Sequence, residues 1–291
     1  MQKNFSLAWR STYSEQLNND GFINTENSVL IKKILKNSNA LKQLSVVVCL
    51  SSLIIDNNSL LNNFAENVEI LSGIGLSFTI IHDYKGLIMK YLNFFDINKE
   101  QYSLRFGNEK SVDLLEMIIS GYINKRVVSK LCYSGLSALG FSGKDGSLIV
   151  AKKSRDSIEE ISKIFTGEPF TINPEILFEI EDTKIIPIIS PVSFNDKGKT
   201  MILDTELTAA MIASAISANK LLIMCDNSFL LNEVKTIISI NELDKLLDNS
   251  LEINDNSPLI RASRYALLNS ETEVHFVDPR NSDSVLMSIF G

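Results

Sequence analysis

The chain has 291 residues, of which 45% are hydrophobic and 22% are charged. This composition excludes a disordered chain, and the length is enough for one large α/β domain or two fused lobes. The net charge of −7 argues against the basic surface that binding to nucleic-acid phosphates requires, so no nucleic-acid partner is expected.

Cysteine usage indicates a reducing compartment, and the lengths of the hydrophobic runs indicate neither a signal peptide nor a membrane span. Cys49, Cys132 and Cys225 are widely spaced without a CxxC pair, so neither a metal site nor a disulfide framework is expected. Residues 1–20 contain no apolar core of signal-peptide length, and no run reaches the roughly 18 apolar residues that a membrane span requires. We therefore predict a cytoplasmic protein with no membrane partner and no bound metal ion.

Residues 1–40 have mixed polar and helical character, and we predict that they form an N-terminal extension. Behind them, Ser45–Ser51 and Ser77–His82 are continuous apolar runs, which are typical of parallel strands buried on both faces. Between these runs, apolar residues recur at helical spacing, and they are Leu60, Leu61, Phe64, Val68 and Leu71. This segment predicts one βαβ unit.

A second set of elements is expected in the last part of the chain. Strands are predicted at Ile185–Ser190, Leu221–Asp226 and Val274–Asp278, and helices at Thr205–Ala218, at Pro258–Leu268 and near the end through Leu286. Alternating strands and helices are typical of a mainly parallel sheet with helices on both faces. We therefore predict an α/β fold, an αβα sandwich around a central mainly parallel sheet.

Between the two regions, Gly143–Gly146 reads GKDG and is flanked by residues that favour strands. Asp145 and Gly146 can supply the positive φ angles that a tight turn requires. This pattern predicts a β-hairpin.

Three consecutive segments carry a family resemblance. Ser120–Val128 reads SGYINKRVV, Gly140–Gly146 reads GFSGKDG, and Leu148–Lys153 reads LIVAKK. In this order and spacing they resemble the middle of an N-acetylglutamate kinase, a member of the amino-acid kinase family. The resemblance implies an amino-acid-kinase-like αβα sandwich with a substrate and dimer lobe at residues 41–180 and a nucleotide lobe at residues 181–291.

The resemblance also implies a homodimer or a larger homo-oligomer. Leu114–Ile119 and Asn124–Leu131 keep their helical apolar spacing, and in the family this region lies near the dimer interface. In the family members that arginine regulates, an N-terminal helix interlaces dimers into hexamers. Residues 1–40 would fit that role.

The catalytic positions of the family are largely replaced in this chain. Family members end the first strand in a lysine that stabilises the transferred phosphoryl group, and two glycines beyond it let the backbone approach the phosphates. Cys49, Ser51 and Ser52 stand at these positions. A second lysine, which contacts ATP phosphate in the family, corresponds to Leu259. Both phosphate lysines are therefore absent, and Ser51 and Ser52 remain as expected nucleotide-binding residues.

The second glycine-rich turn of the family is also altered. It reads His-Gly-Gly-Gly-Pro in the family and HDYKG over His82–Gly86 here. Asp83, Tyr84 and Lys85 thus place side chains where backbone amides hold the substrate in the family. The carboxylate of Asp83 would repel phosphate, whereas Lys85 is a candidate for binding substrate.

Some of the family's other site residues are retained in this chain, and others are replaced. The arginine that holds the α-carboxylate of acetylglutamate corresponds to Arg105 and is retained. An asparagine that contacts substrate becomes Ile202, which cannot make an amide contact. The catalytic aspartate that organises the two lysines becomes Glu206, and Asp226 keeps the aspartate that lies near the adenosine.

These replacements indicate a kinase scaffold with lost or strongly reduced phosphotransfer and a binding, oligomeric or regulatory role. Removing one preorganised donor typically costs about 10²–10³ in rate, although such losses are not additive. The expected partner is a further copy of the chain, an intact paralogue or a regulatory protein, and no cofactor would then be required.

Two alternatives stay open. The first is a divergent, active N-acetylglutamate kinase of arginine biosynthesis that uses ATP and Mg²⁺, in which Arg105 holds the substrate and Glu206 organises the site. Lys85, Lys144 and Lys199 are candidates for replacing the lost cation. The second alternative is a sensor that binds an amino acid or a partner protein without chemistry.

Two further patterns are interpreted as structural. Ser193–Thr200 resembles a Walker A loop but lacks its first glycine, and a strand-like segment follows where a phosphate loop needs a helix. His82 and His275 are expected at strand ends, where they serve as hydrogen-bonded packing residues and not as general bases.

Overall fold

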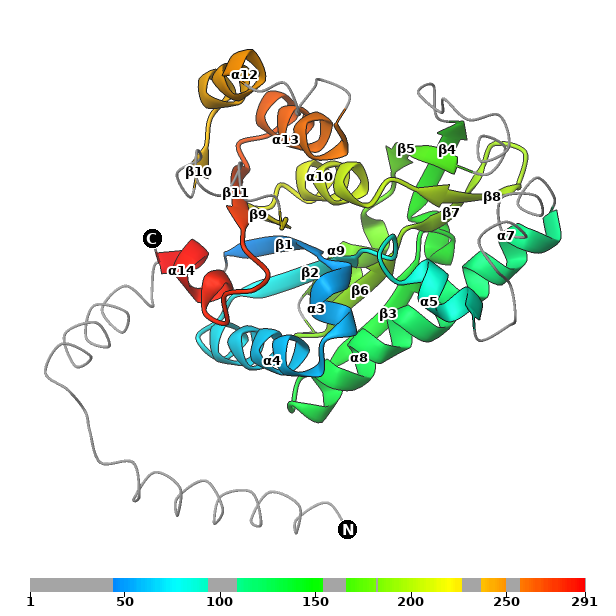
Figure 1. Ribbon diagram of the computed structural model, residues 1–291, viewed down its shortest axis with the longest axis horizontal. Coiled ribbons are helices and arrows are strands. Elements are labelled where there is room, and N and C mark those ends of the chain that lie inside the picture. The colour runs from blue at the N-terminus through cyan, green and yellow to red at the C-terminus, as the bar shows by residue number, and fades with distance from the viewer. Residues whose placement is uncertain are drawn as a thin grey trace, which may run out of the picture. The chain divides into compact units, whose positions relative to one another are not determined.

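The computed structural model describes residues 44–93, 109–153, 166–181, 183–226, 237–249 and 257–290 (Figure 1). All of them belong to the unit Lys42–Gly291. The predicted extension over residues 1–40 and the predicted substrate residue Arg105 lie outside the described residues. Within the described ranges, none of the helices combines the length and the apolar character needed to cross a membrane.

A seven-stranded sheet forms the centre of the described part of the chain. Its strand order is β10-β11-β9-β1-β2-β6-β3, and each neighbouring pair is parallel except β10 and β11. The strands are β1 (Ser45–Leu50), β2 (Ser77–His82), β3 (Ala138–Ser142), β6 (Ile186–Ser190), β9 (Lys220–Met224), β10 (Ile237–Ile238) and β11 (Glu273–Val277). The predicted α/β fold with a mainly parallel sheet is confirmed.

Helices cover both faces of this sheet (Figure 1). On one face, α4 (Asn58–Gly73), α8 (Asn124–Tyr133) and α14 (Ser284–Phe290) pack against its strands. On the other face, α10 (Thr205–Ala215) lies on β1, β2 and β9, and α13 (Pro258–Asn269) packs on α10 and β11. The shorter segments are α3 (Ser52–Asp56), α5 (Ile88–Asn93), α7 (Glu109–Glu116), the π-helix η1 (Met117–Ile123), α9 (Glu175–Glu181) and α12 (Ile240–Asn249). The predicted αβα sandwich is therefore confirmed.

The core between the sheet and α10 is built from alternate residues of the strands. Because successive side chains of a strand point to opposite faces, Val47 and Cys49 of β1 lie on the α10 side. On the helix, Ala209, Ala210 and Ala213 belong to the same cluster and are fully buried. These small side chains let α10 lie close to the strand ends, which brings its first turn near the carboxyl edge of the sheet.

Four short strands, β4 (Ile149–Lys153), β5 (Thr166–Ile172), β7 (Val192–Asn195) and β8 (Thr200–Leu203), form a small closed barrel. The hairpin predicted at GKDG is wrong, because β3 pairs with β6 in the main sheet and β4 pairs with β5 and β7 in the barrel. A 3₁₀ turn, η2 (Asp145–Ser147), joins them. Gly146 has the expected positive φ of 57°, but Ser147 has one of 52° as well. η2 therefore connects β3 of the seven-stranded sheet to β4 of the barrel.

Both histidines of the chain are fully buried. His82 ends β2, whereas His275 lies inside β11 and not at a strand end. One ring nitrogen of each, Nε2 of His82 and Nδ1 of His275, makes no hydrogen bond with the described groups. Burial lowers the pKa of both imidazoles to about 4, and the ammonium of Lys220 adds to the effect at His275. Both rings are therefore neutral packing groups at physiological pH.

We predict that the protein loses stability as the pH falls from about 6.5 towards about 4. The pKa of about 4 for His82 and His275 in the folded state lies below the ordinary value, so the unfolded chain binds more protons in this window and the free energy of unfolding decreases. Each histidine contributes a slope of up to about 1.4 kcal/mol per pH unit. Urea denaturation across this window should give a shallower pH dependence for His82→Gln than for the wild type. Equal slopes for the two proteins would contradict the prediction.

Candidate functional site

Ligands of open α/β sheets bind at the carboxyl ends of the strands, where the strand order reverses. Here β2 lies on one side of β1, and β9 and β11 lie on the other, so the reversal falls between β1 and β9. The predicted positions Cys49, Ser51, Ser52 and Asp226 lie at or just after these two strand ends. The turn after β2 and the first turn of α10 meet at the same edge.

Cys49, which is predicted to stand at the position of the family's first phosphate lysine, is a core residue that is 3% exposed. Burial raises the pKa of its thiol, and the carboxylates of Glu206, Asp83 and Asp204 add to the rise. The thiol is therefore neutral at physiological pH. This position supplies no positive charge to an anionic ligand.

Ser51 and Ser52 form the start of α3. The hydroxyl of Ser51 accepts a hydrogen bond from the backbone amide of Leu53 at 3.2 Å and caps the helix. Ser52 lies against Gly86 of the next turn, where an added Cβ would be 2.7 Å from Ser52 Oγ. The two turns are thus in contact, and the side chain of Ser52 fills the space between them.

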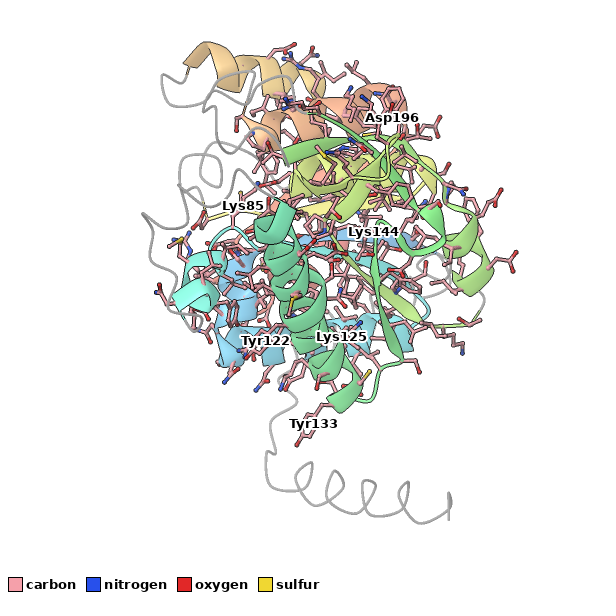
Figure 2. All side chains as sticks on the ribbon, turned by 90° about the vertical axis from the view of Figure 1, so that its right-hand side faces the viewer. Lys85, Tyr122, Lys125, Tyr133, Lys144 and Asp196 are labelled. Atoms are coloured by element: carbon pink, nitrogen blue, oxygen red, sulfur yellow. The ribbon has the colours of Figure 1, made fainter. Side chains whose placement is uncertain are left out.

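Lys85, labelled in Figure 2, extends from the turn after β2 to the first turn of α10. Its Nζ lies 2.6 Å from Oε2 of Glu206 and 3.9 Å from Oδ2 of Asp204. Asp204 is also the N-cap of α10 and accepts a hydrogen bond from the backbone amide of Leu207 at 2.8 Å. The side chain of Lys85 is 42% exposed, whereas those of Asp204 and Glu206 are 17% and 22% exposed. The ion pair is therefore more shielded from water on its carboxylate side.

Two further contacts tie the turn after β2 to α10. Oδ1 of Asp83 accepts hydrogen bonds from the backbone amide of Lys85 at 3.2 Å and from the hydroxyl of Thr205 at 3.4 Å. The hydroxyl of Tyr84 donates to the carbonyl of Leu203 at 3.4 Å. Together with the ion pair, these contacts engage all three side chains that replace the family's glycines, and they hold the turn on the end of β8 and the start of α10.

Burial and neighbouring charges have opposite effects on the pKa of Lys85 in this cluster. Burial by itself would lower the pKa of Lys85, but the carboxylates of Glu206 and Asp204 outweigh it and raise that pKa above its usual value. Burial raises the pKa of Glu206, Lys85 opposes the rise, and repulsion from Asp204 and Asp83 adds to it. Lys85 is therefore charged at physiological pH, and its charge favours the ionised form of the carboxylate beside it.

Several groups of this arrangement are already engaged and are therefore not available to the phosphates of MgATP. A phosphate site needs free backbone amides and available cations. Here the amides of Leu53, Lys85 and Leu207 already donate to nearby side chains, and the ammonium of Lys85 is already paired. Its neighbours are three carboxylates, so the cluster carries excess negative charge. Within the described ranges, no group of three His, Cys, Asp or Glu side chains could hold a metal ion.

Three other predicted site positions lie on β8, after β9 and on α13. Ile202 is 3% exposed within β8, and Leu259 packs partly buried against the core in the first turn of α13. Asp226 follows β9 as an exposed residue. Neither Ile202 nor Leu259 offers a polar side chain to a ligand.

Lys144, a candidate replacement cation, makes contacts away from Lys85, and Figure 2 shows the two lysines apart. Its Nζ lies 2.6 Å from Oε2 of Glu116 and 2.8 Å from Oγ1 of Thr200. It thus links the turn after β3 to the end of α7 and the start of β8. Lys199 lies in the turn between the antiparallel strands β7 and β8, so the segment that resembles a Walker A loop is a hairpin.

One buried ion pair was not indicated by any sequence pattern. Glu168 of β5 is 6% exposed, and its Oε1 lies 2.6 Å from the guanidinium of Arg261 in α13. Lys152 of β4 approaches the other carboxylate oxygen at 4.0 Å. Glu168 and Arg261 are 93 positions apart in the sequence, beyond the reach of short-range patterns. The pair fixes α13 against the barrel.

The parallel sheet, the small barrel and the site at the carboxyl edge define an α/β kinase scaffold. The model of the amino acid kinase family matches residues 45–278, and the chain belongs to this family. The acetylglutamate kinase of Rhodospirillum centenum is 32% identical over 200 residues, which cover 66% of this chain and 66% of that protein. The acetylglutamate kinase of Caldanaerobacter subterraneus is 31% identical over 232 residues, which cover 77% of each. The predicted family resemblance is confirmed.

A solved structure supports the fold. The N-acetylglutamate synthase of Neisseria gonorrhoeae, complexed with coenzyme A and N-acetylglutamate, superposes with a TM-score of 0.70 at 17% identity. The match covers 89% of this chain and 60% of that one. At this identity the likeness shows the fold alone.

We predict that Lys85→Met lowers the free energy of unfolding by about 1–2 kcal/mol, because it leaves partly buried carboxylates facing one another. Adding Glu206→Gln to this variant should recover most of the lost free energy of unfolding, since it removes the unpaired charge. Urea denaturation of the wild type, both single variants and the double variant would measure the coupling.

Lys90→Met is the matched control, because the exposed pair of Lys90 with Asp56 should have no measurable effect on stability. Independent, additive effects of Lys85→Met and Glu206→Gln would show that the two side chains do not interact.

Proposed function

We propose that this family member has lost most or all phosphotransfer and acts as a binding or oligomer-forming protein. The observation that carries the proposal is the closed Lys85–Glu206 cluster, in which the ammonium is neutralised by neighbouring carboxylates. A transferred phosphoryl group is anionic throughout the reaction and needs preorganised positive charge around it. At this edge it would meet excess negative charge and backbone amides that are already engaged.

The replaced lysine positions support the same function. The thiol of Cys49 is buried and neutral at one of them, and the side chain of Leu259 packs against the core at the other. Loss of one charge-stabilising donor costs about 10²–10³ in rate. Two such losses remove much of an ordinary kinase's rate advantage even though they do not simply add.

We expect the purified protein to form no ADP from MgATP and N-acetylglutamate above background, and calorimetry to detect no binding of MgATP at millimolar concentration. An active acetylglutamate kinase assayed in parallel would serve as the positive control. Turnover in the ordinary kinase range of about 1–100 s⁻¹ would overturn the proposal.

A divergent, active acetylglutamate kinase is the second candidate function, and the 2.6 Å contact between Lys85 and Glu206 favours it. The resemblance places Glu206 where the family has the aspartate that organises its lysines. Here that residue holds a lysine from the turn after β2, so Lys85 would supply the lost cation from a new position. ATP, Mg²⁺ and an acylated amino acid would then be the reactants.

If the wild type forms ADP only when N-acetylglutamate is present, Lys85→Met should reduce kcat by about 10²-fold or more, because it removes the remaining preorganised cation. Lys90→Met, which removes an exposed lysine of α5, should leave kcat unchanged. Equal activity of Lys85→Met and the wild type would exclude this second function.

We further propose that the protein forms a homodimer through β3 and η1. β3 is the edge strand of the seven-stranded sheet and contacts η1. Large apolar side chains are exposed there, with Leu139 46%, Tyr122 55% and Met117 64% exposed, and Figure 2 shows Tyr122 near Lys125 on this helical face. An exposed edge strand beside apolar side chains favours pairing with a second chain.

Sedimentation velocity should give a dimer for the wild type and a monomer for the double variant Leu139→Asp/Tyr122→Asp, because the two carboxylates would lie in the interface. Leu268→Asp is the matched control, since Leu268 is 64% exposed on α13 in the other helical layer. A monomeric wild type, or a double variant that still dimerises, would contradict the proposed interface.

A further inference from the structure

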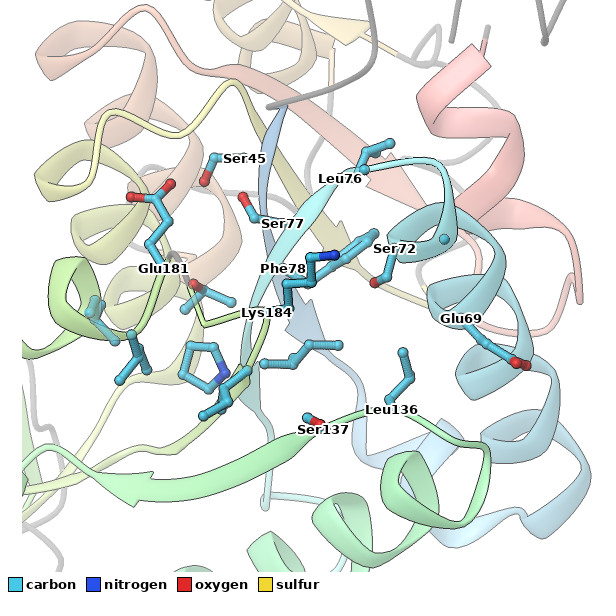
Figure 3. Close-up of a pocket in the computed structure, with 18 of the residues that line it drawn as sticks. Ser45, Glu69, Ser72, Leu76, Ser77, Phe78, Leu136, Ser137, Glu181 and Lys184 are labelled. Atoms are coloured by element: carbon cyan, nitrogen blue, oxygen red, sulfur yellow. The ribbon is translucent and has the colours of Figure 1, made fainter. Parts of the chain in front are cut away.

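A cavity of about 950 Å³ lies at the amino ends of β1, β2 and β6 (Figure 3). Its walls come from the end of α4, from the segments before β2 and β3, and from the end of α9 with the segment that leads into β6. It therefore lies at the opposite edge of the sheet from Lys85 and Glu206. No residue of that cluster lines it.

The walls of this cavity combine apolar and polar surface in similar amounts. The apolar lining includes Leu76, Phe78, Leu136, Leu177, Phe178 and Ile180. Phe178 is 49% exposed although it is large and aromatic. Concave apolar surfaces with a few polar groups are typical of sites for small organic ligands, whose hydrocarbon parts they shield from water.

Lys184 gives the cavity a positive charge. It lies between α9 and β6, and its side chain points into the cavity (Figure 3). It makes no hydrogen bond or ion pair with the residues that the structure describes. Its backbone has a φ of 59°, which is uncommon for a residue other than glycine and is often found at functional sites.

Hydroxyl groups and two carboxylates add to the polar lining, and the hydroxyls come from Ser45, Ser72, Ser77, Thr79 and Ser137. Oγ of Ser72, on the α4 wall, is buried and has no hydrogen-bond partner in the described part of the chain, which is unfavourable for a hydroxyl. Rotation of its side chain to another staggered position would present it to a ligand. Glu69 and Glu181 also line the cavity, so a ligand with several negative charges would be repelled.

We infer that this cavity binds a small monocarboxylate with an apolar body. The carboxylate accepts hydrogen bonds from Lys184 and Ser72, and the hydrocarbon part lies on the apolar walls. Nζ of Lys184 can pair with one carboxylate, whereas Glu69 and Glu181, which outnumber this cation, would repel any further negative charge of a phosphate or a dicarboxylate. The inference concerns a different edge of the sheet and does not depend on the proposed loss of phosphotransfer.

The test is a calorimetric titration of the full chain with hexanoate, compared with hexanamide, which has the same shape without the charge. Hexanoate should bind saturably and hexanamide more weakly. Lys184→Met should weaken hexanoate binding by about tenfold or more, because it removes a charged hydrogen-bond donor while keeping the apolar stem. Lys197→Met, which removes an exposed lysine from the turn between β7 and β8, and Lys85→Met should keep the wild-type affinity.

Several outcomes would overturn the inference. They are the absence of saturable hexanoate binding by the wild type, equal binding of hexanoate and hexanamide, and full binding by Lys184→Met. Equal weakening by Lys197→Met would indicate general charge attraction and would also overturn it. Weakening by Lys85→Met alone would assign hexanoate to the carboxyl edge. The comparison of hexanoate with hexanamide uses the wild type only, so it decides the question even if a variant fails to fold.

Discussion

The ion pair between Lys85 and Glu206 is the contact on which the carboxyl edge of the sheet depends. Lys85 leaves the turn after β2 and Glu206 leaves the first turn of α10, so the pair joins two segments that are 121 positions apart. Its ammonium also balances the nearby carboxylates of Asp204 and Asp83. Without this charge, partly buried carboxylates would face one another, which would destabilise both the turn and the start of α10.

The fold and the carboxyl edge of the sheet depend on different interactions. The sheet is held by apolar side chains such as Val47 and by the small residues of α10, none of which needs a ligand. Cys49 belongs to that core, so the residue predicted to stand at the family's lysine position packs inside the protein. Burial of an apolar side chain stabilises the fold wherever it occurs, whereas a phosphate site requires exposed charge at a particular edge.

The two edges of the sheet consequently differ in what they can bind. At the carboxyl edge, cations and amides are paired within the protein, and the remaining charge is negative. At the amino edge, a cavity with mixed apolar and polar walls contains Lys184, whose side chain has no partner among the described residues. The proposed binding site at the amino edge is therefore separate from the ion pair at the carboxyl edge.

The sequence by itself predicted the elements whose signal is local. Continuous apolar runs predicted β1 and β2, and helical spacing of apolar residues predicted α4 and α10, because burial imposes a fixed period on each element. Cys49 and Leu259 could likewise be compared with the family motif from the sequence alone, because this comparison uses only the position of each residue in the chain. Local signals did not predict which strands pair with each other. GKDG was predicted to close a hairpin, but β3 pairs with β6, and β4 pairs with β5 and β7.

Tertiary structure alone decided which charges meet. Lys85 was a candidate for binding substrate, and only the packing of α10 on the strand ends placed it against Glu206. Glu168 and Arg261, and the walls around Lys184, were likewise brought together from distant segments. The physical reason is that the period of an apolar pattern is a property of each segment, whereas ion pairs and cavities depend on how separate segments pack in space.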